Sequence, residues 1–248
     1  MISAIIGGTG FQIPETGLTR LEIQTPYGEV VLFEDHGGGD DALYYLPRHG
    51  EGHILPPHRV NYRANIQALR QLGVVQVIGI YAVGSITSMV LPGNFGIIDQ
   101  FIDFTNGRES TFFDGGVTGV RHIPMVEPYS RRLRALIART AVEQNLKLSL
   151  KGTYVCTNGP RLETPAEIAM FRKWGADYVG MTAATETILL REAQIDFAGI
   201  AYSVNWAAGL DAEGFSFIEE EISHRVVSQI LQLAQAVLKL PPLETVRG

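Results

Sequence analysis

Short apolar segments alternate with amphipathic segments along this chain, and that alternation restricts its fold more than any other feature. The apolar runs have the length of buried strands, and the segments between them space their apolar residues as helices do. This pattern predicts one α/β domain over residues 1–248, with a mixed, largely parallel twisted sheet flanked by helices. The expected strands cover residues 4–6, 42–46, 74–80, 95–98, 153–156, 178–181 and 197–204.

Two capping signals help to place the helices. Thr164 and Glu167 have the spacing of a capping box around Pro165, and Ser216 and Glu219 repeat that spacing before the last amphipathic segment. The first box therefore predicts a helix start at residue 165, and the second predicts that the last helix begins near residue 216. The expected helices cover residues 61–72, 131–143, 165–174 and the segment from the Ser216 cap to the prolines at 241 and 242, which leaves a tail at 241–248.

Composition excludes several classes of protein. With 46% hydrophobic and 19% charged residues, the 248-residue chain is typical of a globular protein with one large core. A net charge of −6 argues against a nucleic acid or an anionic membrane as partner. Cys156 is the only cysteine, which rules out an internal disulfide and fits a buried strand position. The N-terminus lacks the basic start of a signal peptide and no apolar run reaches transmembrane length, so we expect a cytoplasmic location.

Polar residues follow two of the early strands, where α/β proteins bind their ligands. Thr9 lies in a glycine-rich turn that favours either an anion site or a plain turn, and a dinucleotide fingerprint fails because Ile13 stands at the third glycine position. Arg48 and His49 form a donor pair suited to phosphate, with a surface turn as the alternative. Nearby histidines share no ligand spacing with a carboxylate or a cysteine, so no metal site is expected.

Later strand ends carry a second group of candidates. Met181 and Thr182 are suited to packing and hydrogen bonding with a sugar, although a core Met beside a helix cap explains them equally well. Asn205 offers both a donor and an acceptor, or simply initiates a turn. Glu163 precedes the helix at residue 165 but has no capping duty, which leaves it to bind a polar ligand edge or to remain a solvated loop acid.

Taken together, these motifs resemble those of the trimeric purine nucleoside phosphorylases and methylthioadenosine phosphorylases. The resemblance extends from Ile5 to about Leu238. It implies a nucleoside phosphorylase-like fold, a homotrimer, and a purine salvage reaction in which phosphate cleaves a purine nucleoside without a metal or an organic cofactor. The motifs that carry it are residues 7–10, 48–50, 56–66, 82–85, 159–164, 179–182 and 205–209.

The resemblance also implies roles for individual residues. Asn205, Glu163 and His49 would be the catalytic residues, and His122 would reach the sugar pocket of a neighbouring subunit. Phosphate would be bound by Thr9, Arg48, His49 and the backbone of Ala82. The ribose and its 5′ group would contact Met181, Thr182 and Phe217, and the base would contact Glu163, Asn205 and Leu162.

Two positions indicate the substrate. Glu163 can accept a hydrogen bond from N1–H of a 6-oxopurine and Asn205 can donate towards O6 and N7, whereas adenine-specific relatives have Ser and Asp at these places. Phe217 falls where nucleoside-cleaving relatives have a histidine for the 5′-hydroxyl, which favours an apolar 5′ group. The sequence therefore predicts conversion of 5′-methylthioinosine and phosphate to hypoxanthine and 5-methylthioribose 1-phosphate.

Other functions stay open at this point. The enzyme alternatives are an inosine and guanosine phosphorylase and a methylthioadenosine phosphorylase. Tyr81 stands where the family has a small Thr, Ser or Asn near phosphate. This residue favours a protein of a different class, one that binds purine nucleosides without turnover. The segment from Ala183 to Glu186 also departs from the family pattern, with Thr185 at the place of a proline.

Overall fold

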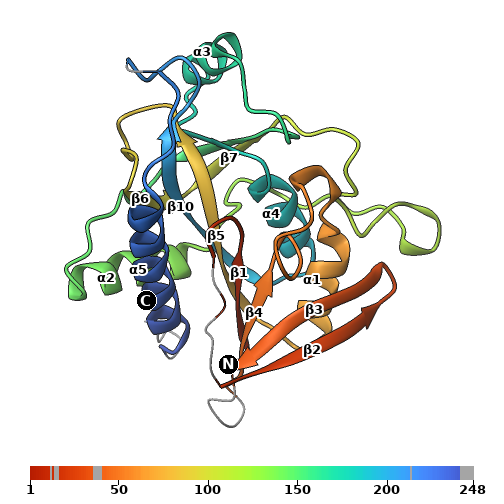
Figure 1. The fold of residues 1–248 in the computed structure, drawn as a ribbon. Helices are drawn as coiled ribbons and strands as arrows, with labels where there is room; N and C mark the ends of the chain where they lie inside the picture. The colour runs from red at the N-terminus through yellow and green to blue at the C-terminus, as the bar shows by residue number, and fades with distance from the viewer. Residues whose placement is uncertain (12, 14–16, 36–40, 213, 241–248) are drawn as a thin grey trace, which may run out of the picture.

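A twisted mixed sheet lies between two layers of helices (Figure 1), which confirms the predicted α/β class. The computed structural model describes all residues except 12, 14–16, 36–40, 213 and 241–248, so the expected C-terminal tail lies outside the described residues. The strands are β1 Ser3–Gly7, β2 Leu18–Thr25, β3 Gly28–Asp35, β4 Leu43–Pro47, β5 Gln76–Ser85, β6 Phe95–Ile98, β7 Gln100–Asp103, β8 Thr153–Cys156, β9 Tyr178–Gly180 and β10 Asp196–Trp206. The helices are α1 Tyr62–Gln71, α2 Arg131–Glu143, α3 Pro165–Lys173, α4 Ala183–Glu192 and α5 Glu220–Leu238, with short 3-10 turns η1 Pro57–Arg59 and η2 Gly116–Thr118.

Strand β5 is the branch point of the sheet. Along one edge it pairs with β10, and along the other it pairs first with β1 and then with β9. Pairing with β1 ends at Gly79 and pairing with β9 begins at Gly84, so none of the described strands pairs with residues 80–83 on that edge. Such a divergence of neighbouring strands opens a crevice at their carboxyl ends, the usual ligand site of an α/β sheet. The full order is β2-β3-β4-β1-β5-β9-β8-β7, with β10 between β5 and β6.

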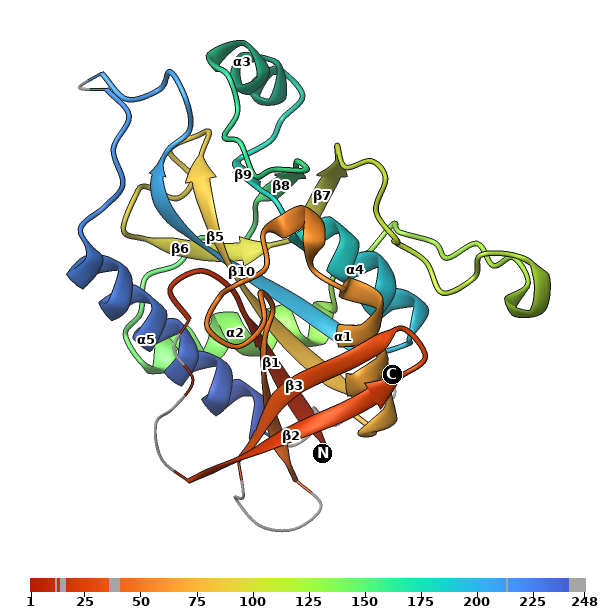
Figure 2. The same ribbon diagram turned by 45° about the vertical axis from the view of Figure 1, so that its right-hand side comes forward.

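The helices cover opposite faces of the sheet (Figure 2). Helices α1 and α4 pack together on one face, and α2 and α5 pack together on the other. The apolar stripes of these helices bury Ile66 and Leu69 of α1, Leu133 of α2, and Ile230 and Leu233 of α5 against the strands. Because both faces are covered, β1 is buried throughout and β5 at every position except Ala82, which is why their sequences are largely apolar.

Most predicted helix boundaries are confirmed by their caps. Helix α1 is capped by Asn61, whose side chain accepts from the backbone of Ala64, and Ser130 caps α2 in the same way. At α3 both hydrogen bonds of the Thr164–Glu167 capping box are present. These caps satisfy backbone N–H groups that the first turn of a helix leaves without partners.

The helix start predicted from the second capping box is wrong. Helix α5 begins at Glu220 instead of near Ser216, and no side chain caps it. The backbone N–H of Ile218 donates to the carbonyl of Val204 in β10 at 2.8 Å. This bond ties the segment to the sheet in a non-helical conformation, so Phe217 lies before the helix.

The prediction also missed strands β2, β3 and β7. In β2 the apolar Leu21 and Ile23 alternate with exposed polar residues, a period-two signal that could have identified the strand. Strand β7 is short and half exposed, and it is held mainly by its parallel pairing with β8. Tertiary pairing, not local pattern, therefore determines β7.

The α3 cap supports a stability prediction. Replacing Thr164 with alanine removes the hydroxyl that accepts from Glu167, and we expect the free energy of unfolding to fall by about 1 kcal/mol. Thr164→Ser keeps the acceptor and should stay close to the unaltered protein. Equilibrium unfolding in urea measures both variants, and equal stability of the alanine and serine variants would contradict the prediction.

Candidate active site

A pocket lies at the carboxyl ends of β5, β9 and β10, beside the divergence of β1 from β5. It brings together residues from seven separate parts of the chain. The sequence-predicted residues that line it are Thr9, Arg48, His49, Ala82, Leu162, Glu163, Met181, Thr182, Asn205 and Phe217.

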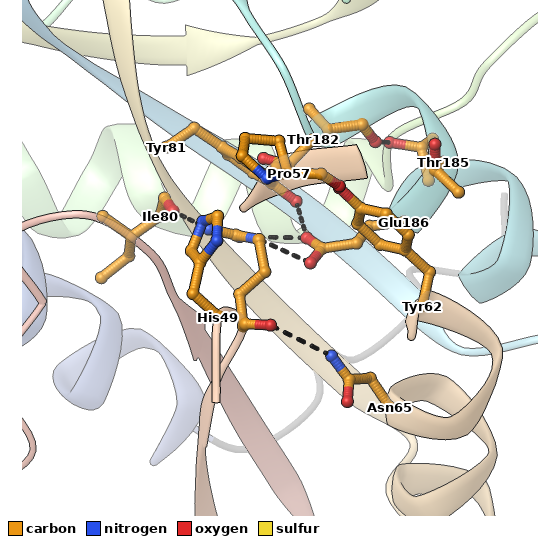
Figure 3. Close-up of polar contacts among 12 residues, drawn as sticks. His49, Pro57, Tyr62, Asn65, Ile80, Tyr81, Thr182, Thr185 and Glu186 are labelled. Carbon is orange, nitrogen blue, oxygen red and sulfur yellow. Dashed lines mark hydrogen bonds and ion pairs between the residues drawn. The ribbon is translucent and has the colours of Figure 1, made fainter. Parts of the chain in front are cut away.

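Arg48 follows β4 and is almost completely buried beneath this pocket. Its Nε donates to Oε1 of Glu186 at 2.5 Å, and Nη2 donates to Oε2 at 3.0 Å. Nη1 donates to the carbonyl of Ile80 at 3.0 Å, one of the β5 groups left open by the divergence of β1 (Figure 3). Burial lowers the pKa of Arg48, but Glu186 more than offsets this, and the pKa stays above its ordinary value. The guanidinium is therefore permanently charged and held in a fixed orientation.

His49 presents a neutral ring to the pocket. Its Nδ1 lies 2.7 Å from the carbonyl oxygen of Leu55, and because a carbonyl only accepts, Nδ1 carries the hydrogen. Burial and the neighbouring Arg48 charge lower the pKa of His49 to about 4. In the neutral ring, Nε2 is consequently an acceptor, able to take a proton or a hydrogen bond from a ligand.

Glu163 lines the same pocket as Arg48. The hydroxyl of Thr157 donates to its Oε1 at 2.7 Å. Burial raises the pKa of the Glu163 carboxyl, and the Thr157 hydrogen bond opposes that rise. A carboxylate can accept about four hydrogen bonds, so Glu163 keeps acceptor capacity for a ligand beside this contact.

A β-bulge in β10 sets the position of Asn205. The register with β5 shifts between Ser203 and Asn205, which leaves Val204 as the extra residue. A bulge re-aims the side chains that follow it, and here it places the buried Asn205 on the pocket wall. One N–H of its amide donates to the carbonyl of Trp206 at 2.6 Å, so the second N–H can serve a ligand.

The sugar-side candidates line the pocket together with two aromatic rings. Met181 packs so closely over Gly159 that a Cβ there would lie 2.4 Å from the Met181 sulfur. Phe215 and Phe217 also line the pocket, with ring centroids 5.1 Å apart in an edge-to-face arrangement. Both rings are about half exposed, so the entrance offers apolar surface that a ligand could cover.

His122 does not join this group. It is exposed in the segment between η2 and α2, and it is not among the residues that line the pocket. Its predicted place in the sugar pocket of another subunit stays a prediction. Among the described residues, no cluster of three or more His, Cys, Asp or Glu side chains could hold a metal ion. No helix in the described part of the chain is long and apolar enough to cross a bilayer.

Sequence reasoning did not predict the contacts behind the pocket, although it singled out Tyr81 as a departure from the family pattern. Glu186 in α4 pairs with Arg48 from inside the core, and Tyr81 joins that pair. Arg108 connects three elements, donating to the hydroxyl groups of Tyr62 and Thr185 at 3.3 and 3.2 Å and to the carbonyls of residues 157 and 158. A charged residue within the apolar α4 pattern was the available signal for Glu186, because a buried charge requires a partner.

Comparison with known proteins agrees with this geometry. Residues 3–239 match the family model described as Phosphorylase superfamily. The chain belongs to the phosphorylase superfamily. The 6-oxopurine nucleoside phosphorylase of Pyrococcus furiosus is 41% identical over 97% of this chain and 93% of its own length. The probable S-methyl-5′-thioinosine phosphorylase of Methanopyrus kandleri is 42% identical over 87% of this chain and 85% of its own.

A solved structure extends the match to three dimensions. The methylthioadenosine phosphorylase of Schistosoma mansoni in complex with adenine superposes with a TM-score of 0.86. It is 31% identical, and the match covers 95% of this chain and 90% of the other. The resemblance to nucleoside phosphorylases drawn from the motifs is thereby confirmed, and so is the fold that it implied.

The environment of His49 in this phosphorylase leads to a pH prediction. Because the pKa is lowered from 6.5 to about 4, the unfolded chain takes up a proton before the folded chain does, and stability falls as pH drops from about 6.5 to 4. We expect the nitrogen NMR shifts of His49 to show a neutral Nδ1–H ring down to about pH 4 in the phosphate-free enzyme. Exposed His58 is the internal comparison, and a His49 midpoint as high as 6.5 would contradict the prediction.

Proposed function

We propose that this phosphorylase cleaves a 6-oxopurine nucleoside with inorganic phosphate, and that its substrate is 5′-methylthioinosine. The observation that carries the proposal is the pairing of Glu163 and Asn205 in one pocket that also holds Arg48 and His49. The first pair fits the donor and acceptor edge of a 6-oxopurine, and the second pair fits phosphate. The names of the relatives, a 6-oxopurine nucleoside phosphorylase and a probable S-methyl-5′-thioinosine phosphorylase, support the same class of substrate.

At the phosphate end, the groups supply directed hydrogen bonds. Thr9 offers its hydroxyl and Arg48 its two remaining N–H groups, while Ala82 contributes backbone. His49 Nε2 accepts from a protonated phosphate oxygen, or carries a proton itself when the anion is bound. Helix α4 begins next to Thr182, and the partial positive charge of a helix N-terminus favours an anion there. These groups hold phosphate beneath C1′ of the sugar.

At the base end, the pocket stabilises the leaving group. As the bond from C1′ to the base breaks, negative charge develops on the purine and positive charge on the sugar. The free N–H of Asn205 donates towards N7 and O6, and the Glu163 carboxylate accepts from N1–H. The oxygen of hydrogen phosphate then bonds to C1′ and the phosphate releases its proton, while the purine anion takes up a proton from solvent, giving hypoxanthine and 5-methylthioribose 1-phosphate. We assign no step to a metal or an organic cofactor, because the positioning of phosphate beneath C1′ and the hydrogen bonds to the leaving base suffice to replace the base with phosphate.

At the sugar end, apolar contacts favour the methylthio group. Met181 faces the ribose, and the aromatic pair of Phe215 and Phe217 covers the 5′ position. Burying a methylthio group there releases water from apolar surface, whereas a 5′-hydroxyl would lose its hydrogen bonds. We further propose that the enzyme serves purine salvage as a homotrimer, in which exposed His122 of each subunit contacts the sugar pocket of a neighbour.

Phosphate dependence is the main test. We expect purine release from methylthioinosine to require inorganic phosphate and to exceed release from methylthioadenosine, because adenine presents a lone pair to Glu163. In Arg48→Lys the charge remains but the forked donor is lost, so kcat/KM for phosphate should fall about ten- to a hundredfold.

A matched variant controls for the loss of an arginine. Arg59→Lys changes an exposed arginine of η1 and should leave phosphate kinetics unchanged. Product analysis by chromatography separates the outcomes. Equal rates with and without phosphate would show hydrolysis, and a preference for methylthioadenosine would overturn the assignment of the base.

The aromatic pair supports a second test, on the 5′ group. We expect methylthioinosine to surpass inosine mainly through a lower KM, because stranding a hydroxyl against Phe217 costs about 1–3 kcal/mol. Phe217→His supplies a partner for the hydroxyl and should reduce the ratio of kcat/KM for the two nucleosides about tenfold. Phe217→Leu keeps the site apolar and should preserve the ratio. An inosine preference in the unaltered enzyme would favour the inosine and guanosine reaction instead.

A further inference from the structure

Tyr81 lies at the divergence of the strands, but its hydroxyl points behind the pocket. It follows Ile80 in the unpaired part of β5, and its ring is 1% exposed. The ring fits over two glycines of the sheet: a Cβ at Gly79 would lie 2.5 Å from the Tyr81 hydroxyl, and one at Gly199 would lie 3.3 Å from the ring. The sheet is therefore shaped to accept this large side chain.

The Tyr81 hydroxyl donates to Oε2 of Glu186 at 2.6 Å (Figure 3). The same oxygen accepts from Nη2 of Arg48 at 3.0 Å, so tyrosine and arginine share one carboxylate oxygen. The Tyr81 ring also lies beneath the guanidinium, with 4.3 Å from Cζ of Arg48 to the ring centroid. Tyr81 thus contacts both members of the buried ion pair.

The donors of Arg48 are almost fully assigned. Of its five N–H groups, Nε–H and one on Nη2 bind Glu186, and one on Nη1 binds the carbonyl of Ile80. One N–H on each terminal nitrogen remains for a ligand. Gly8 leaves room for this arrangement, since a Cβ there would lie 2.3 Å from Nη1. Small rotations of the guanidinium would therefore misdirect both remaining donors.

We propose that Tyr81 is a positioning residue for phosphate, acting through Glu186 on Arg48. By donating a hydrogen bond to Oε2, the Tyr81 hydroxyl weakens the attraction between this carboxylate oxygen and Nη2 of Arg48. The two remaining N–H groups of Arg48 keep their direction towards the pocket, and more of the arginine's positive field reaches it. Without the hydroxyl, Oε2 of Glu186 accepts a hydrogen bond from Arg48 alone, and the guanidinium of Arg48 rotates towards the carboxylate. The inference rests on the proposed phosphorolysis.

Tyr81→Phe tests the hydroxyl, because it keeps the ring, its packing and its contact with Arg48. We expect KM for phosphate to rise about tenfold, the loss of one hydrogen bond to a charged group, while KM for methylthioinosine changes less than about twofold. The inhibition constant of sulfate, a competitor for phosphate, should rise in the same proportion. A purely structural role would instead lower stability without separating the two substrates.

Tyr129→Phe is the matched control. Tyr129 is equally buried, and its hydroxyl accepts a hydrogen bond from Thr187, the residue after Glu186 on α4. Removing that hydroxyl should affect stability and leave KM for phosphate unchanged. A double-mutant cycle tests whether Tyr81 acts through Glu186. In a Glu186→Gln background, Tyr81→Phe should change KM for phosphate less than about twofold.

The outcomes separate this inference from the proposed function. Phosphate-dependent cleavage by the unaltered enzyme, together with an unchanged phosphate KM in a folded Tyr81→Phe variant, overturns the inference alone. Equal changes in both KM values, or equal effects of Tyr81→Phe and Tyr129→Phe, also overturn it. Purine release that ignores phosphate in the unaltered enzyme overturns the proposed function and the inference with it.

Discussion

The buried ion pair between Arg48 and Glu186 is the interaction on which the site depends. The two residues are 138 positions apart, one after β4 and the other in α4, and each is about 1% exposed. A buried pair adds little stability over an apolar one, but removing one partner costs about 3–5 kcal/mol because the other charge remains. The pair therefore fixes where the loop after β4 meets α4, and that junction is the floor of the pocket.

The sheet makes the ion pair possible. Because β1 and β9 leave a gap along β5, the carbonyl of Ile80 is free to accept from Arg48, and Tyr81 has space to reach Glu186. A continuous sheet would have consumed the Ile80 carbonyl in strand pairing. The same gap leaves Ala82 accessible to a ligand, so one interruption in strand pairing serves both the floor and the wall of the site.

Local signals predicted much of the fold and failed where distant contacts compete. The caps at Asn61, Ser130 and Thr164 act within one helical turn, so their sequences suffice. Ser216 has the same signal, but the bond from Ile218 to Val204 in β10 holds that segment against the sheet. Phe217 nevertheless lines the pocket, because the tie to β10 leads the chain past it.

The sequence by itself determined the alternation of strands and helices and the kinds of polar group at the strand ends. Each of Thr9, Glu163 and Asn205 had an ordinary alternative explanation, since hydrogen-bonding groups are common in turns. Only the tertiary structure decided that they share a pocket, and that Glu186 and Tyr81 support Arg48 beneath it. The reason is physical: periodicity and capping arise from neighbours within a few residues, whereas the partner of a buried charge is selected by how the sheet and helices pack.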